Sequence, residues 1–416
     1  MDYIFKKWYM EKDKSPVEDL YRARFNGETT RRLDLSIRPM GQDRIFPLYF
    51  VPTAEMMQKM EEVYYYDEIL TQLVEILPAV AHERFFADVI ADELQSSNEI
   101  EGVHSNRQDI AASARALAAG ERPPSPRMNS MITTYLALRD DEGIALPKTP
   151  ADIRALYDRV TEGEIDADNL PDGKIFVREG AEVSGAAYGK LLHRGVQGEA
   201  AIIAHIEALL QFLADESLPL LIRLAIGHYY FGYIHPFYDG NGRTSRFLTS
   251  LYLSKQLSLY TANSFAKGCR LEHRKYLDMF EKANRFNGYG EMNVVIDGFL
   301  NILLAGQDAI GTTLGEKGLL LALCEKNLAL DPELADDGLA REAAMLLCQA
   351  MIYSDGTFTQ QALTAQMQAE GGHKRTAIRR ALDALEAQGR ITRVKGKPIT
   401  YALAPAWYDQ LMAGLR

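Results

Sequence analysis

The stretch that decides the fold reads His235-Pro236-Phe237-Tyr238-Asp239-Gly240-Asn241-Gly242-Arg243-Thr244-Ser245-Arg246. It lies between two apolar segments, residues 221–234 and residues 247–253, whose composition predicts buried helices. The polar stretch is therefore predicted to be a loop that joins two core helices and ends at the start of the second one.

The chemistry of this loop favours an anion. Gly240-Asn241-Gly242 can turn the backbone so that several N–H groups point outward. The first turn of the following helix adds free N–H donors and the positive end of the helix dipole. Arg243 and Arg246 are three residues apart and share a helix face, where two guanidiniums can hold phosphate oxygens. We expect a phosphate site here.

Two further side chains extend this site. Asp239 fits beside phosphates only if a cation lies between them, and Mg²⁺ held by one carboxylate and phosphate oxygens is the usual arrangement. His235, at the other end of the loop, is a candidate general base near neutral pH. The alternative is a plain helix-joining loop with a capping Asn and surface arginines, which has no need of His, Asp and two Arg together.

The stretch resembles the signature of the Fic family, HPFx(D/E)GNGRxxR, and matches it at every specified position. The resemblance implies transfer of a nucleotide phosphate moiety, most often AMP from ATP, to a hydroxyl side chain (Ser, Thr or Tyr) of a protein. The implied roles are general base for His235, metal ligand for Asp239, and phosphate binding for Gly240, Asn241, Gly242, Arg243 and Arg246. ATP and Mg²⁺ are the implied cofactors.

A second pattern precedes this one. Residues 84–104 read as an amphipathic helix that contains Ser97, Glu101 and Gly102. These residues resemble the family's inhibitory pattern, (S/T)xxxE(G/N), in the class that carries an N-terminal inhibitory helix. A carboxylate presented to Arg246 would neutralise it and occupy the place of the outermost phosphate, leaving ATP misplaced for in-line attack. The alternative is that Glu101 is a solvated residue near a helix end.

Two other site assignments follow from the resemblance. Residues 175–178 and 181–183 read as short strands of a hairpin. In the family this hairpin, the flap, docks an extended segment of the target protein by strand addition, here near residues 181–193. A plain surface hairpin is the alternative. Tyr276 is a candidate for contact with adenine, and a buried packing role is its alternative.

The C-terminal part looks like a winged helix-turn-helix. Helices are predicted over 340–353, 359–368 and 374–388, followed by a hairpin over 391–403. Residues 371–397 carry eight basic and two acidic side chains, a local charge that suits DNA. Winged helices also serve as protein docking or dimerisation modules, so DNA contact, protein contact and a homodimer all stay open.

The composition indicates the number of domains, the cellular compartment and the lack of membrane association. The chain has 416 residues, a net charge of −11 and an ordinary 47% of hydrophobic residues, as expected for a globular protein of two or three domains. Three cysteines without metal-ligand spacing suit a reducing cytoplasm. No signal peptide and no uncharged apolar run of membrane length is recognised, so we expect no membrane association.

These observations predict a mainly α fold: a helical Fic core with a small β-hairpin flap, an N-terminal helical region and a C-terminal winged-helix domain. The predicted division is 1–122 for the N-terminal region, 123–305 for the catalytic core, 306–338 for a connector and 339–416 for the winged helix. The leading function is an autoinhibited protein adenylyltransferase. The alternatives are transfer of another phosphate moiety, removal of AMP, and transcriptional regulation.

Overall fold

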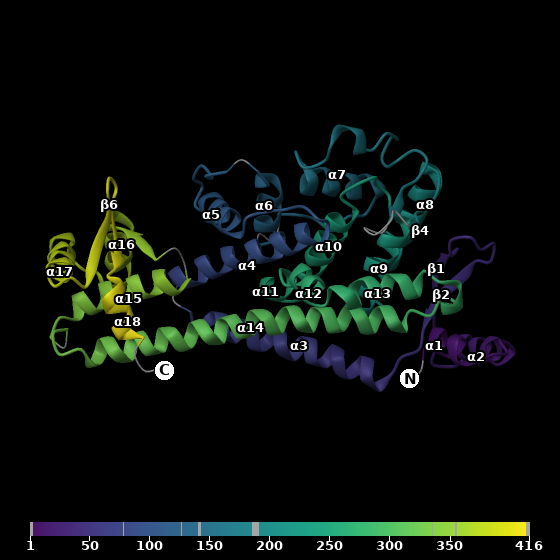
Figure 1. The fold of residues 1–416 in the computed structure, drawn as a ribbon, viewed down its shortest axis with the longest axis horizontal. Helices are drawn as coiled ribbons and strands as arrows, with labels where there is room; N and C mark the ends of the chain where they lie inside the picture. The colour runs from purple at the N-terminus through teal and green to yellow at the C-terminus, as the bar shows by residue number, and fades with distance from the viewer. Residues whose placement is uncertain are drawn as a thin grey trace. The chain divides into compact units, whose positions relative to one another are not determined.

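The computed structural model describes residues 3–77, 79–125, 127–139, 143–184, 191–334, 336–353 and 356–412. The prediction of a mainly α fold is confirmed, because the described chain consists mostly of helices and has small antiparallel sheets beside them (Figure 1).

The chain forms two compact units. The first comprises residues 1–71 and 89–310, and the second comprises residues 72–88 and 311–416. Three helices contribute residues to both units: α3 (Ala54–Glu75), α4 (Ala79–Ile100) and α14 (Asn293–Leu330). The boundary drawn at residue 305 from the sequence falls inside α14, and the four predicted divisions stay a prediction.

The first unit holds most of the helices. Those confined to it are α1 (Ile4–Met10), α2 (Ser15–Phe25), α5 (Arg107–Ala118), α6 (Asn129–Leu136), α7 (Pro150–Thr161), α8 (Glu199–Leu213), α9 (Leu220–Ile234), α10 (Asn241–Leu253), α11 (Leu259–Ala262), α12 (Phe265–Leu271) and α13 (His273–Ala283). Short 3-10 turns cover Ala137–Arg139, Ala167–Asn169 and Phe286–Gly288. Two hairpins complete it: β1 (Arg31–Ile37) with β2 (Phe46–Phe50), and β3 (Glu182–Ser184) with β4 (Leu191–Arg194).

The centre of this unit is the helix pair α9 and α10. Every residue of α9 except Gly232 is buried, and every residue of α10 except Gly242 is buried. A Cβ on Gly232 would lie 2.5 Å from the ring of Phe280, so the glycine lets α13 approach α9 closely. The two helices that flank the polar stretch are thus core elements, as predicted.

One sequence prediction differs from the structure in this unit. Residues 175–178 were expected to form a strand, but they are irregular, and the hairpin uses β3 and β4 instead. The reason is that Glu199 accepts hydrogen bonds from the N–H groups of Ile175 and Phe176 at 2.6 and 3.0 Å. A side chain thus takes the donors that a strand partner would use. The predicted turn over residues 185–190 lies outside the described residues.

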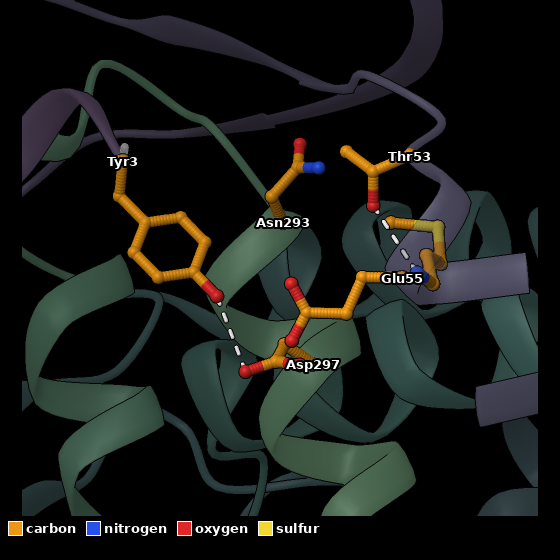
Figure 2. Close-up of a pocket in the computed structure, with 6 residues that line it drawn as sticks. Tyr3, Thr53, Glu55, Asn293 and Asp297 are labelled. Atoms are coloured by element: carbon orange, nitrogen blue, oxygen red, sulfur yellow. Dashed lines mark hydrogen bonds between the residues drawn. The ribbon is translucent and has the colours of Figure 1, made fainter. Parts of the chain in front are cut away.

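A small polar cavity lies where the N-terminal segment meets the start of α14 (Figure 2). Its volume of about 20 Å³ is room for about one water molecule. The hydroxyl of Tyr3 donates to Asp297 at 3.1 Å there, and Lys59 pairs with both Glu55 and Asp297. One lysine thus pairs with both carboxylates, and the cavity has the size and polar lining of a structural water site.

The second unit contains a compact C-terminal module. Its elements are α15 (Gly338–Tyr353), β5 (Thr357–Thr359), α16 (Gln360–Gly371), α17 (Arg375–Ala387), β6 (Ile391–Gly396), β7 (Ile399–Leu403) and α18 (Pro405–Leu411). The strands pair antiparallel in the order β5-β7-β6. Buried side chains of Leu347, Ile378, Leu382 and Tyr401 join the helices to the sheet. Figure 1 shows the β6–β7 hairpin extending beyond α16 and α17.

Helix α14 is long and apolar enough to meet the length and composition criteria for a membrane span, within the described part of the chain. Half of its apolar window is buried inside the protein, as in core helices of soluble proteins, so this is weak evidence for a membrane span.

Candidate functional site

The signature stretch, residues 235–246, begins where α9 ends. His235 caps this helix in the left-handed conformation, with φ 53°, and its N–H donates to Phe231 O at 2.9 Å. Left-handed backbone at a non-glycine residue is strained and is found where the surroundings enforce it. This left-handed conformation turns the chain sharply out of the helix and places the imidazole at the start of the loop.

The base of the β3–β4 hairpin enforces this geometry. His193 bonds through Nε2 to Tyr233 O at 2.8 Å, and Val196 N donates to Ile234 O at 2.9 Å. On the other side of His235, Val177 N donates to Pro236 O at 3.2 Å. Carbonyls on both sides of His235 are therefore fixed by neighbouring segments, and the hairpin and the signature stretch form one connected unit.

The surroundings of His235 favour its neutral form. Burial, together with the nearby His193, lowers the pKa of His235 to about 4, although Glu101 and Asp239 act to raise it. The imidazole is therefore uncharged near neutral pH, which is the form that can accept a proton.

The side chain of Asn241 forms hydrogen bonds within the loop. Its Oδ1 accepts from Phe237 N at 3.0 Å and its Nδ2 donates to Phe237 O at 2.5 Å, so the amide closes the loop on itself. The residue was predicted to hold phosphate. With this side chain occupied, only the backbone N–H of Asn241 is placed for an anion.

Helix α10 offers an anion site at its first turn. Gly240 precedes the helix with φ 80°, and the first helical bond runs from Thr244 N to Gly240 O at 3.0 Å. The N–H groups of Asn241, Gly242 and Arg243 come before that bond and so lie at the open end of the helix. Such N–H groups, with the helix dipole, attract anions.

An anion from the same chain already lies at this end of α10. A Cβ built on Gly242 would be 2.0 Å from Glu101 Oε1 and 2.8 Å from Arg246 Nη1. The carboxylate of Glu101 is therefore packed directly against the backbone of the first turn, which only a glycine permits. The sequence predicted a Glu101–Arg246 contact, and the structure adds the close approach to Gly242.

Arg246 is the charged partner of that carboxylate. Its Nη2 donates to Glu101 Oε1 at 2.8 Å and to Ser97 O at 2.8 Å, while its Nε donates to Ser97 Oγ at 3.0 Å. The guanidinium is fully buried. Burial acts to lower the pKa of Arg246, but Glu101, Tyr276 and Cys269 together raise it more, so the pKa lies above its usual value and the cation persists. Gly102 ends the segment with φ 74°.

Arg243 and Asp239 form a weaker pair beside it. Arg243 Nη2 lies 3.3 Å from Asp239 Oδ1, and the same oxygen accepts from Gly240 N at 2.5 Å. The Asp239 side chain is 40% exposed, so a carboxylate oxygen is available to a cation. Arg243 is buried and its Nε has no hydrogen-bond partner among the described residues. A buried donor without a partner is costly, and an added anion would satisfy it.

The fit of a nucleotide triphosphate with Mg²⁺ can be judged from these groups. Open N–H donors, an unpartnered buried guanidinium nitrogen and a glycine that admits a carboxylate oxygen all suit phosphate oxygens. No group of three or more His, Cys, Asp or Glu side chains suited to a metal occurs among the described residues. A metal at Asp239 would thus need phosphate oxygens as its other ligands, in keeping with the prediction for Mg²⁺.

The docking of α4 involves a charged residue that the sequence analysis did not identify. Glu93 is fully buried and accepts from Ala266 N at 2.9 Å and Lys267 N at 3.1 Å, at the start of α12. Burial raises the pKa of Glu93 to about 7, although these hydrogen bonds act to lower it. Glu93, Ser97 and Glu101 are four residues apart and share a helix face, which was the available signal.

Tyr276 lies in the core. It is 5% exposed, and its hydroxyl bonds to His228 Nε2 at 3.0 Å. His228 also bonds to Ser245 and Thr249 of α10, and burial lowers the pKa of His228 to about 3, so it is a neutral core histidine. This geometry favours the packing alternative for Tyr276, and contact with adenine remains a prediction.

Comparison with known proteins relates the chain to one family. Residues 147–253 match the family model described as "Fic/DOC family". This range contains α7 to α10 and the whole signature stretch, but not Glu101. Thus His235, Asp239, Arg243 and Arg246 belong to the matched segment, and the carboxylate at Arg246 comes from outside it.

Three solved structures resemble the chain. A Fic family protein from Desulfovibrio desulfuricans G20 is 20% identical, covers 85% of this chain and 97% of its own, and has a TM-score of 0.49. A Fic domain containing signaling protein from Bacteroides thetaiotaomicron VPI-5482 is 18% identical, with 62% and 95% covered and a TM-score of 0.41. A Fic-1 fragment from C. elegans is 18% identical, with 63% and 74% covered and a TM-score of 0.41.

Proposed function

We propose that this chain, which carries a Fic/DOC domain over residues 147–253, is a cytoplasmic protein adenylyltransferase. It transfers AMP from ATP to a Ser, Thr or Tyr hydroxyl of a target protein or of itself. Its own helix α4 holds it in a low-activity state. The target binds along the β3–β4 hairpin, near residues 181–193, where an exposed strand edge accepts many sequences.

One observation carries this proposal. The carboxylate of Glu101 lies against Gly242 and 2.8 Å from Arg246 Nη2, at the open end of α10. A buried cation and free N–H donors attract a negative group there, and the chain supplies one from a separate helix. We infer that Glu101 occupies the place of the outermost phosphate of ATP, so that a triphosphate bound beside it is misplaced.

The residues have distinct roles in the proposed reaction. The N–H groups at the start of α10, with Arg243 and Arg246, bind the phosphates. His235 is neutral, because its pKa lies near 4, and it accepts the proton of the attacking hydroxyl. The hydroxyl oxygen forms a bond to the α-phosphorus while the bond to pyrophosphate breaks. Asp239 would hold Mg²⁺, which neutralises phosphate charge when bound.

The hairpin contacts explain how His235 stays in place during this step. His193 and Val196 hold the carbonyls of Tyr233 and Ile234, and Val177 holds that of Pro236. A general base must be positioned to within a fraction of an ångström to act in the transition state. These hydrogen bonds connect the β3–β4 hairpin, which binds the target, to the residues on either side of His235. The same hairpin therefore orients both the hydroxyl of the bound target and the imidazole.

The test is labelling with Mg²⁺ and ATP that is radioactive at the α-phosphate, which stays with the transferred AMP. Glu101→Gly should increase AMP incorporation at least about tenfold, since about 1.4 kcal/mol of docking energy corresponds to a factor of ten. Glu121→Gly is the matched control, because it makes the same change at an exposed carboxylate outside α4. His235→Ala added to Glu101→Gly should abolish incorporation.

The outcome also separates the alternatives. Equal labelling of the native chain and Glu101→Gly would refute the inhibitory role. A mass increase other than that of AMP on the labelled protein would indicate transfer of a different phosphate moiety. Loss of AMP from a previously modified target, dependent on Glu101, would indicate that the activity is removal of AMP. Inhibition and transfer are thus tested by different variants.

A further inference from the structure

The C-terminal module exposes one face of α17 and one hairpin. Helix α17 packs against the module core through Ile378, Ala381, Leu382 and Leu385. Its opposite face is exposed, and β6 with β7 forms a hairpin whose tip is at residues 396–399. The Fic/DOC match ends at residue 253, so the proposed adenylyltransfer leaves this module without a role.

Basic side chains gather on these two exposed elements. We define the basic face as Lys374, Arg375, Arg379, Arg380, Arg393, Lys395 and Lys397, all exposed. Asp383 and Glu386 are the acidic residues of the same stretch; they pair with Arg379 at 3.9 Å and Arg393 at 2.7 Å. The first two turns of α17 contain no carboxylate.

The structure removes one residue from the predicted DNA-binding set. Arg390 is buried, and it pairs with Asp331 and Glu333 at 2.8 Å while its guanidinium lies over the ring of Trp407 at 5.1 Å. Arg390 therefore stabilises the module and does not face a partner. With Arg390 set aside, residues 371–397 carry seven positive and two negative side chains, on a chain whose total charge is −11.

We propose that the basic face binds double-stranded DNA, with the start of α17 in the major groove and the β6–β7 tip on a phosphate backbone. The exposed part of a 13-residue helix suits a groove about 12 Å wide. Helices that read DNA usually present their N-terminal residues to it, where this helix has Lys374, Arg375, Arg379 and Arg380. Phosphates supply the complementary charge.

The composition of the face argues for DNA over a protein partner or a second copy of the chain. Protein interfaces contain a central apolar or aromatic patch and are depleted in lysine. Among the described residues from 338 onward, Val394 is the large apolar side chain that is markedly exposed. A single valine among cations cannot form such a patch, whereas a polyanion needs none.

The experiment measures binding of a fluorescent random-sequence DNA duplex of about 30 base pairs to the full chain by anisotropy, at about 50 to 200 mM salt. The test variant combines Lys374→Ala, Arg375→Ala and Arg380→Ala. The control combines Lys148→Ala, Arg159→Ala and Lys255→Ala, exposed residues of the first unit, and so removes the same charge elsewhere.

We expect the test variant to bind at least about tenfold more weakly than the native chain, with a shallower salt dependence, and the control to bind within about twofold. Equal loss of affinity in both variants would show that the binding depends only on general charge, and this would overturn the proposal. Absence of DNA binding, or a dimer in light scattering that depends on the basic face, would also overturn it. Both variants should retain AMP transfer after Glu101→Gly, so this test is independent of the proposed enzyme activity.

Discussion

At the scale of single residues, Glu93 is a buried carboxyl of the first unit that the sequence analysis did not identify. The carboxyl is fully buried, and the N–H groups of Ala266 and Lys267 bind it at the start of α12. Burial raises the pKa of Glu93 to about 7, which is above the value near 4.5 of a free glutamate. Such a group binds a proton more tightly in the folded protein than in the unfolded chain.

This predicts a pH dependence of stability. The stabilisation from protonated Glu93 is complete below pH about 4.5 and is lost as pH rises through about 7, by up to about 3 kcal/mol. Thermal unfolding from pH 5 to 7.5 should therefore show a falling melting temperature for the native chain and a smaller fall for Glu93→Gln. Parallel curves for the two proteins would contradict the assignment of this titration to Glu93.

Residue chemistry explains which site residues were predictable. His235, Asp239, Arg243 and Arg246 were identified because such groups have no role in a plain connecting loop. Asn241 was predicted to hold phosphate as part of the Gly240-Asn241-Gly242 turn, which stays a prediction, and its side-chain amide closes the loop on Phe237. The sequence cannot distinguish these uses, because an amide at a helix start serves backbone and ligand equally well. Glu93 was missed because burial, which makes it unusual, depends on the packing of α12.

At the scale of elements, α4 is held by more contacts than the one with Arg246. Asp92 pairs with Lys267 at 2.6 Å, Ser96 Oγ accepts from Arg270 Nε at 3.1 Å, and these bonds anchor α4 to α12. The inhibitory position of Glu101 thus depends on a helix that is docked along several turns.

This docking predicts partial activation without any change at Arg246. Lys267→Ala with Arg270→Ala should weaken docking by roughly 1 kcal/mol, since two partly exposed charged contacts are lost. AMP incorporation should rise about fivefold, less than in Glu101→Gly, and amide hydrogen exchange over residues 92–100 should accelerate. The exchange measurement reports docking even if the chain has a different activity.

The matched control for that pair is Lys275→Ala with Lys282→Ala. These lysines lie on α13, and among the described residues their ion pairs are with Glu272 and Asp278, while Lys282 also lies over the ring of Phe5 at 5.7 Å. Exchange over α4 should be unchanged in the control. Equal acceleration in both double variants would mean that general charge, and not these contacts, governs the docking of α4.

The helices and the C-terminal hairpin over residues 391–403 were predictable, and the first strand of the flap hairpin was not. Predicted helices 221–234 and 374–388 correspond to α9 and α17 within a few residues, because their apolar spacing is continuous and their ends carry turn residues. The strand expected at 175–178 does not form, because Glu199 takes the N–H groups of Ile175 and Phe176. A contact from a residue more than twenty positions away competes with strand formation and leaves no local pattern.

At the scale of the whole molecule, the division into units could not be read from the sequence. Composition changes mark turns such as residues 331–338, and they suggested a connector there. The compact units instead share α3, α4 and α14, each of which contributes residues to both. Helical periodicity is the same on either side of such a boundary, so only the contacts of the folded chain reveal where one core ends.

Each unit contains one of the two tryptophans, which allows the units to be monitored separately. Trp8 lies in α1 of the first unit, edge-on to Phe286, and Trp407 lies in α18 of the second. Unfolding of Trp8→Phe is therefore reported by Trp407, and unfolding of Trp407→Phe by Trp8. Denaturant midpoints measured in the two backgrounds show whether a substitution acts on one unit or on both.

Arg390→Ala should destabilise the second unit by about 2 kcal/mol, because Asp331 would keep a partly buried charge without its partner. We expect a lower denaturant midpoint in the Trp8→Phe background, where Trp407 reports, and little change in the Trp407→Phe background, where Trp8 reports. Arg380→Ala, an exposed arginine of the same module, should change either midpoint by less than about 0.5 kcal/mol. If Arg390→Ala shifts both midpoints equally, the shared helices make the two units unfold as one cooperative structure, and the prediction of separate transitions fails.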